Sequence, residues 1–138
     1  MKIANFEKRV ISYLIDLGIS LGFSFLLYYF ALINIDFIKK LNSFVIISLC
    51  SSLIYFILNS IITYVSNGYT IGNLFARIKI ISEDQNRIHF KNTLLKYCFM
   101  CFPICIFVNA IYMLIVHSQK TIFDILSNTI SISTKKEF

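Results

Sequence analysis

The chain has 138 residues and a net charge of +6; 57% of its residues are hydrophobic and only 14% are charged. Soluble domains usually carry about 25% charged residues, so this composition and a mean hydropathy of +0.74 argue against a water-soluble domain and favour one modest membrane domain. The basic residues stand at the ends of apolar runs and form no basic face with interleaved aromatic residues, so we expect no nucleic-acid binding.

Three segments have the roughly 20 mostly apolar residues that a helix needs to cross a bilayer: 10–33, 44–65 and 94–116. The first follows three basic residues, as the core of a signal peptide would. It is too long for such a core, and no small-residue cleavage site follows it, so we expect it to stay attached. The sequence predicts an all-α membrane protein with one domain, 1–138.

The first segment carries a polar stripe on one helical face: Arg9, Ser12, Tyr13, Asp16, Ser20 and Ser24. A carboxylate at the middle of a membrane helix costs about 2.5–3.5 kcal/mol on insertion scales, so Asp16 needs a partner. A direct pair with Arg9, two turns away, would be strained; nearby serines, a polar residue of the second segment, or water are the alternatives. Asp16 is therefore either a protonatable group on an ion or proton path or a member of a structural network.

The other two segments carry similar stripes. They are Ser48, Ser52, Tyr55, Asn59 and Thr63 on the second, and Cys98, Cys101, Cys105, Asn109 and Tyr112 on the third. Three weakly polar stripes predict a bundle that hides them from lipid. We expect Ser20, Ser52, Asn59 and Asn109 to support the charged residues. Gly18 and Gly22 form a G-x-x-x-G on the opposite face of the first segment, which by itself is a weak signal for a helix contact.

Neither a metal site nor an enzyme is expected. The cysteines of "CFMCFPIC" lie in an apolar run with no fourth ligand close in sequence, so they read as small packing residues. No nucleophile, zinc-protease, phosphate-binding or dinucleotide-binding motif is present. We therefore expect no cofactor.

The loop 66–93 and the tail 117–138 contain short elements. "TIGNLFA" predicts a short amphipathic helix, "ARIKIIS" and "RIHF" predict two strands around the turn "EDQN", and "NTISIST" in the tail predicts another. "TIFDIL" predicts a short helix in which Asp124 either caps the first turn or joins Arg9. Such strands would pair at the membrane surface, because lipid tolerates no open sheet edge.

The distribution of lysine and arginine predicts the orientation. The N-terminus and the loop 66–93 are rich in basic residues, whereas the linker 34–43 holds only Lys39 and Lys40. We therefore expect the N-terminus and the loop 66–93 in the cytoplasm and the linker 34–43 outside. A third segment that spans fully would put the basic tail outside, against this rule. A segment that is re-entrant at Pro103 would return the tail to the cytoplasm, where "NTISIST" meets "ARIKIIS". We slightly favour the full, kinked span, because neighbouring helices can absorb a break at a proline.

Three stretches resemble the signature blocks of the RDD family of small bacterial membrane proteins: "FEKRVISYLIDLGIS", "GYTIGNLFARIKIIS" and "HSQKTIFDILSNTISIS". The family is named for one arginine and two aspartates, which by motif position are Arg9, Asp16 and Asp124. The chain departs from the family pattern at Asn73, which stands where a lysine is usual. Ala76 replaces a common glycine, and Phe123 replaces a frequent histidine.

The resemblance implies a multi-pass protein of the cell membrane, for which transport, including cation–proton exchange, has been proposed in some members. We expect a transport or permeation component for ions or small solutes that acts as a homo-oligomer or with other membrane proteins. The alternative is a non-transporting scaffold or accessory subunit in which Arg9, Asp16 and Asp124 only hold the helices together.

Overall fold

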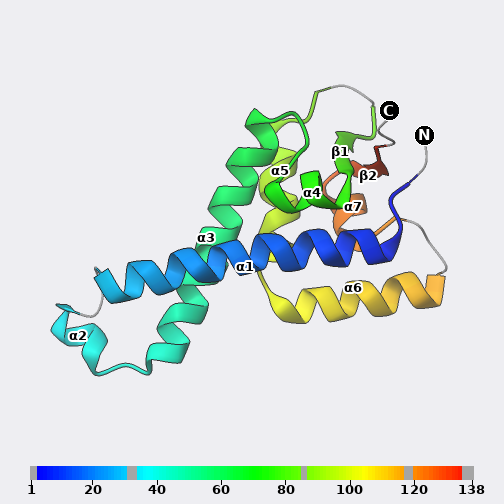
Figure 1. Ribbon diagram of the computed structural model, residues 1–138. Helices are drawn as coiled ribbons and strands as arrows, with labels where there is room; N and C mark the ends of the chain where they lie inside the picture. Colours follow the sequence, from blue (N-terminus) through cyan, green and yellow to red (C-terminus); the bar gives the residue numbers. More distant parts are fainter. Residues whose placement is uncertain (1–2, 31–33, 85–86, 117–119, 135–138) are drawn as a thin grey trace.

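The computed structural model describes residues 3–30, 34–84, 87–116 and 120–134. Its elements are, in chain order, α1 Phe6–Phe30, α2 Asp36–Lys39, α3 Ser43–Val65, α4 Ile71–Ala76, β1 Ile78–Ser82, α5 Phe90–Met100, α6 Pro103–Val116, α7 Ile122–Leu126 and β2 Thr129–Ser133. Two long helices, α1 and α3, cross each other, and the strands with α4 and α7 gather near the start of α1 and the end of α3 (Figure 1).

The first two predicted apolar segments are helices. Both α1, with 25 residues, and α3, with 23, are long and apolar enough to cross a membrane. Helix α3 matches the predicted segment within one residue, whereas α1 begins four residues earlier than predicted; residues 31–33 lie outside the described part of the chain. The linker between them contains the short helix α2.

The two long helices are polar on the inside and apolar on the outside. The buried residues of α1 are Ser12, Asp16, Ser20 and Ser24, and those of α3 include Ser51, Asn59 and Thr63. Large apolar side chains such as Leu14, Phe44 and Leu49 are more than half exposed. This arrangement inverts that of a soluble protein and suits a lipid environment, which accepts apolar side chains and not polar ones.

The two strands pair antiparallel, with Ile80 opposite Ser131. The N-terminus adds an isolated bridge between Ile3 and Ile132. The prediction that "ARIKIIS" meets "NTISIST" is therefore confirmed. The prediction of a further strand at "RIHF" is wrong.

Packing explains why "RIHF" forms no strand. The edge of β1 away from β2 is occupied by the loop after α3, because the Ile80 amide donates to the Gly68 carbonyl oxygen at 2.8 Å. Ile88 is instead buried against Tyr55, Ile80 and Tyr97, and the next turn of the chain begins α5 at Phe90. Burial of one apolar side chain thus decides the path of this stretch.

The third predicted segment is two helices, and they meet at 99°. The chain turns at Cys101 and Phe102, and Pro103 is the first residue of α6, a position where its missing N–H costs nothing. The expected break near Pro103 is present. The single polar stripe along this segment is not, because Cys98 is exposed on α5 and Asn109 is buried on a helix of another direction.

The predicted C-terminal tail is largely structured. Within 120–134 it forms α7 and β2, and residues 117–119 and 135–138 lie outside the described part.

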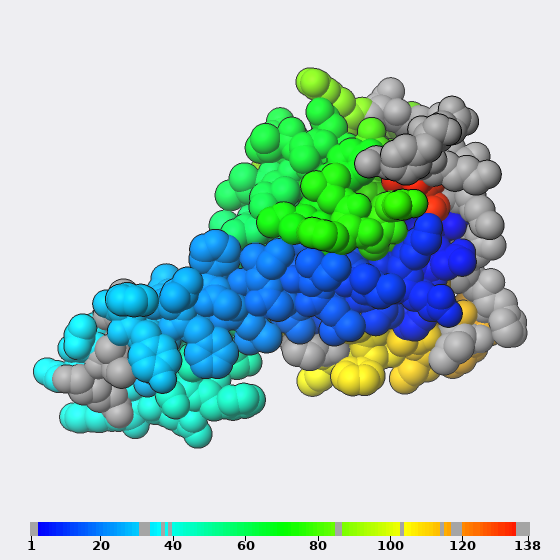
Figure 2. Space-filling model, in the orientation of Figure 1, coloured from blue at the N-terminus to red at the C-terminus, as the bar shows by residue number. Residues whose placement is uncertain are grey.

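In Figure 2, α4 with β1 rests on one edge of the N-terminal half of α1, and α6 shows along the opposite edge. Residues of α4, β1, α6 and α7 line a common interior together with the first half of α1.

Candidate functional site

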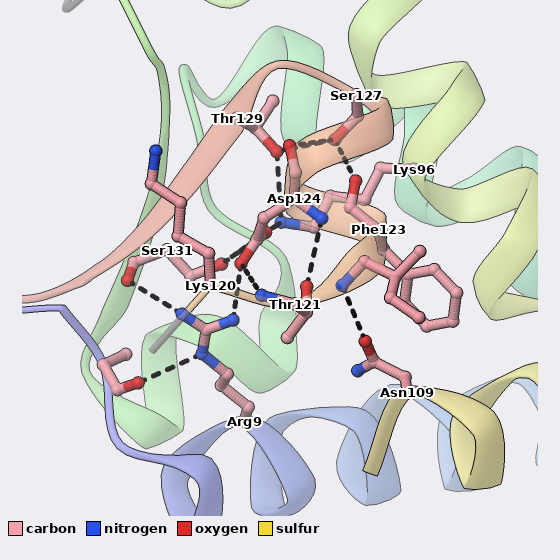
Figure 3. A network of polar contacts seen from close by, with 12 residues as sticks. Arg9, Lys96, Asn109, Lys120, Thr121, Phe123, Asp124, Ser127, Thr129 and Ser131 are labelled. Atoms are coloured by element: carbon pink, nitrogen blue, oxygen red, sulfur yellow. Dashed lines mark hydrogen bonds and ion pairs between the residues drawn. The ribbon is translucent and has the colours of Figure 1, made fainter. Parts of the chain in front are cut away.

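Asp124 on α7 is the centre of a buried charged cluster (Figure 3). Its side chain is 0% exposed. The Arg9 guanidinium donates to Oδ2 at 2.5 Å, and the Lys96 ammonium donates to Oδ1 at 2.6 Å. One carboxylate from the tail thus joins two basic residues that come from α1 and α5, so three distant parts of the chain are fixed to one another.

The local sequence explains why Asp124 takes this position. Thr121 is the N-cap residue of α7, and its hydroxyl accepts from the Asp124 amide at 3.0 Å. In return the Asp124 carboxylate accepts from the Thr121 amide, which completes a capping box. The two roles predicted as alternatives for Asp124, a helix cap and a partner of Arg9, are both present.

Lys96 is a site residue that the sequence argument did not single out. It is 4% exposed, and its ammonium donates to Asp124 and to the Ser131 hydroxyl at 3.1 Å, with a longer bond to Thr129 at 3.4 Å. A signal was available: a lysine inside the run "LLKYCFM" has the same unusual character as an aspartate inside an apolar helix.

The two basic residues keep the Asp124 carboxylate ionised. Burial by itself raises the pKa of this carboxyl group, but the charges of Lys96 and Arg9 and their hydrogen bonds outweigh burial and lower the pKa to about 2. Arg9 also donates from Nε to the Ala4 carbonyl oxygen at 3.1 Å, and its guanidinium donates to the Ser131 carbonyl oxygen of β2 at 3.4 Å. Asp124 is therefore a permanently charged link at neutral pH.

Asp16 has a different environment. Its Oδ2 accepts from the Thr70 hydroxyl at 2.6 Å, and its Oδ1 accepts from the Gly72 amide at 2.7 Å. Both donors belong to the first turn of α4, so the carboxylate holds the start of this helix against α1. Among the described residues, no lysine or arginine lies within ion-pair distance of Asp16.

The contact between α4 and α1 depends on a glycine. A Cβ atom at Gly72 would lie 2.1 Å from the Ser12 carbonyl oxygen and 2.9 Å from Cγ of Asp16. Gly68, at the start of the same loop, has φ +111°, and a Cβ there would lie 2.0 Å from the Ile80 carbonyl oxygen. The two glycines of "GYTIG" thus serve close backbone contacts, and Thr70 between them supplies the hydroxyl for Asp16.

A direct pair between Arg9 and Asp16 is absent, as the distance along α1 suggested. Ser20 was a possible partner of the Asp16 carboxylate, but its hydroxyl donates to the Asp16 backbone carbonyl oxygen. The partners come from the loop after α3, a source that the sequence argument did not weigh. A periodicity argument compares positions on one helix, and it does not show which loop folds back onto that helix.

All three residues of the predicted motif line one cavity of about 100 Å³. Other polar residues in its wall are Ser12, Asn73, Lys96, Tyr97, Asn109 and Ser131. This volume has room for several water molecules. A cavity therefore reaches Asp16, and Arg9, Lys96 and Asp124 line the same space.

The four residues predicted to support the site have different roles. Asn109 lines the cavity, and its side-chain oxygen accepts from the Ile122 amide at the start of α7. Ser20 and Asn59 are buried, although neither lines the cavity. Ser52 is only half-buried; its neighbour Ser51 takes the inward position.

Asn73 is the other polar residue next to Asp16. Its side-chain oxygen accepts from the Ser12 hydroxyl at 2.7 Å. Its Nδ2 is buried in the cavity wall near the Tyr97 hydroxyl, and it makes no hydrogen bond of good geometry with any described residue. A buried donor of this kind is satisfied by water or by another acceptor within the cavity.

The described residues contain no group of three or more His, Cys, Asp or Glu side chains that could hold a metal ion. Cys98, Cys101 and Cys105 lie near the turn between α5 and α6; the thiol of Cys101 donates to the carbonyl oxygen of Cys98, and its side chain packs against the core around Tyr55. Cys98 is exposed, and Cys101 and Cys105 are half-buried.

In a comparison with known proteins, the family model of the RDD family matches residues 3–128 of the chain. The chain belongs to the RDD family. No curated protein and no solved structure matches it. The match confirms the resemblance and covers most of the chain, including the arginine and both aspartates.

The geometry shows how the three residues that resemble the RDD signature are used in this member. Arg9 and Asp124 form an ion pair, whereas Asp16 binds the start of α4. Asn73, which stands where the family usually has a lysine, places an uncharged amide next to Asp16. Of the two motif carboxylates, Asp124 therefore has two basic partners, and Asp16 has, within the described part of the chain, hydrogen-bond donors alone.

Proposed function

We propose that this RDD protein is a transport or permeation component for ions or small solutes, and that Asp16 is the group that exchanges a proton or a cation. The observation that carries the proposal is a cavity of about 100 Å³ that reaches a carboxylate within a long apolar helix. Ionisable groups at such positions are expensive, and they commonly mark an ion or proton path.

The two carboxylates of the cavity divide into two roles. Asp124 has Lys96 and Arg9 as neighbours, so a further cation is repelled there. Asp16 has two hydrogen-bond donors and, among the described residues, no basic neighbour. Its negative charge is therefore available to a proton or a small cation that enters the cavity.

In this proposal α1 and α3 cross the cell membrane and the N-terminus is cytoplasmic. The basic residues near the start of α1 and in β1 support this orientation, because positively charged segments stay inside. Two crossing helices enclose little space, so we propose that several copies, or other membrane proteins, pack together to complete a path across the bilayer.

Flux measurements on reconstituted vesicles test the role of Asp16. In Asp16→Asn the amide oxygen can still accept from Gly72 and the amide nitrogen can donate to Thr70, so the contact with α4 survives. We expect a folded protein that has lost pH- or cation-dependent flux. The control Glu83→Gln removes a carboxylate from an exposed pair with Lys120 and keeps the flux.

A second candidate function is that of a non-transporting scaffold or accessory subunit. It is favoured by the observation that both carboxylates bind backbone or side-chain donors at the start of a short helix. Wild-type vesicles without flux of any tested cation would support the scaffold. Flux that persisted in Asp16→Asn would exclude Asp16 as the exchanging group.

A further inference from the structure

The loop after α3 and the end of the chain are joined by strand pairing. The Thr134 amide donates to the Arg77 carbonyl oxygen, and the Glu83 amide donates to the Asn128 carbonyl oxygen, one bond at each end of the β1–β2 ladder. Paired strands lie about 4.8 Å apart, whereas the hydrocarbon core of a bilayer is about 30 Å thick. No bilayer can therefore separate these two segments.

We propose that α5 and α6 form a re-entrant hairpin, which dips into the membrane from the side of the sheet and returns to that side. The proposal rests on α1 and α3 crossing the bilayer, and it does not depend on transport. It assigns two membrane spans to this chain in place of three. The acyl chains of the leaflet on the sheet side would contact the outer surface of α6.

The lengths of the two helices agree with this path. Helix α5 has 11 residues and helix α6 has 14, which at 1.5 Å per residue give about 16 Å and about 21 Å. Neither length crosses about 30 Å of hydrocarbon. The bend of 99° between them prevents the pair from acting as one long helix. Each helix can descend or ascend through only part of the membrane.

The neighbours of α5 show where it descends. Phe90 at its start stacks edge-to-face on Tyr64, near the end of α3, with ring centroids 5.4 Å apart. Further along, the Tyr97 ring lies 6.1 Å from that of Tyr55, which stands near the middle of α3. Helix α5 thus begins at the sheet-side end of α3 and approaches its middle, so the turn at Phe102 lies deep.

The neighbours of α6 show its return. Ile106 and Asn109 line the cavity together with residues of the first half of α1. The Asn109 side chain also accepts from the Ile122 amide, which belongs to α7 beside the sheet. Figure 1 shows α6 running along the N-terminal half of α1 and not along its C-terminal half.

The outer face of α6 is apolar and uncovered. Ile104, Phe107 and Ile115 are each more than 70% exposed. In water this surface would be a liability, whereas lipid chains accept it. Because the inner face carries Asn109 and α5 carries Lys96, the hairpin is a membrane-embedded wall of the cavity.

Single-cysteine labelling in lipid vesicles tests the path of the hairpin. In a variant whose four native cysteines are replaced by serine, cysteines are introduced one at a time at Lys40, Arg87 and Thr134. An impermeant maleimide should label Arg87→Cys and Thr134→Cys from the same side and Lys40→Cys from the other side. All three positions lie outside the helices expected in the membrane, so the variants should fold.

Depth is measured with a fluorophore attached at Phe102→Cys and, as a matched site, at Val116→Cys; both native side chains are more than half exposed. Lipids brominated near the ends of their acyl chains should quench the probe at position 102 more strongly than the probe at position 116. Lipids brominated near the headgroup should show the reverse order.

Three results would overturn the hairpin. Labelling of Thr134→Cys and Arg87→Cys from opposite sides would establish a full third span. Equal, shallow quenching at positions 102 and 116 would place α6 flat on the surface. Labelling of Lys40→Cys from the same side as Arg87→Cys would remove the two spans together with the hairpin. Loss of flux in any variant leaves these outcomes unaffected, so failure of the transport proposal is a separate result.

Discussion

The two aspartates of this chain show how the same side chain serves different purposes in different surroundings. Asp124 shares its carboxylate between Arg9 and Lys96, so the cluster of three charges keeps one net positive charge. Asp16 instead binds Thr70 and Gly72. The first residue joins three distant parts of the chain, and the second holds one short helix in place and lines the cavity.

Asp124→Asn should strongly destabilise the protein at neutral pH. Loss of the shared carboxylate leaves two buried basic side chains facing each other, and breaking a buried ion pair in this way typically costs about 3–5 kcal/mol. The pKa of Asp124 is about 2 in the folded protein, below its ordinary value of 3.8. Its contribution is therefore present above about pH 4 and disappears as the pH falls through about 2. Thermal unfolding in detergent should show a gap between wild type and variant that closes in this range.

A second substitution separates loss of the ion pair from general damage. The double variant Lys96→Met/Asp124→Asn should recover part of the lost stability, because only Arg9 then remains charged in the cluster. Glu83→Gln, which breaks an exposed pair with Lys120, should change stability by less than about 1 kcal/mol. A double variant as unstable as the sum of its two single variants would contradict the role given to the shared carboxylate.

At the scale of elements, the short helix α4 depends on how closely its first turn can approach α1. Gly72→Ala should cost about 1–3 kcal/mol or more, because the added Cβ would lie 2.1 Å from the Ser12 carbonyl oxygen and overpack the contact. Gly18→Ala and Gly22→Ala are matched controls on α1 itself, since nothing lies within 4 Å of a Cβ at either position. If the two control variants unfolded at lower temperatures than Gly72→Ala, the close contact would be refuted.

The elements that were predictable from the sequence are those whose signal is local. The long apolar runs gave α1 and α3, and the alternation in "ARIKIIS" and "NTISIST" gave both strands. The strand at "RIHF" failed because Ile88 is drawn into the core with Tyr55, a contact across more than thirty residues. Likewise Arg9, Asp16 and Asp124 stood out by motif, and Lys96 stands out as a lysine inside an apolar run, but the partners of Lys96 and Thr70 are set by tertiary contacts.

For the whole molecule, strand pairing changes the interpretation of the charges. A third full span would have placed the basic tail on the side opposite the basic loop. The β1–β2 ladder puts the two together, so the described basic residues from Arg77 to Lys120 gather with those at the start of α1, and Lys40 stands apart. The conflict with the positive-inside rule is then removed.

The cysteine labelling shows which positions share a side of the membrane; fusion proteins test which side is the cytoplasm. Green fluorescent protein fused to the C-terminus should fluoresce, because it folds in the cytoplasm, and alkaline phosphatase fused there should be inactive. Alkaline phosphatase fused after Lys40 in a truncated chain should be active, because the proposed orientation puts the linker between α1 and α3 outside. The reason is electrostatic: short loops rich in lysine and arginine resist translocation. An active C-terminal phosphatase fusion would reverse the orientation, and it would place the Arg9–Asp124–Lys96 cluster on the outer side of the membrane.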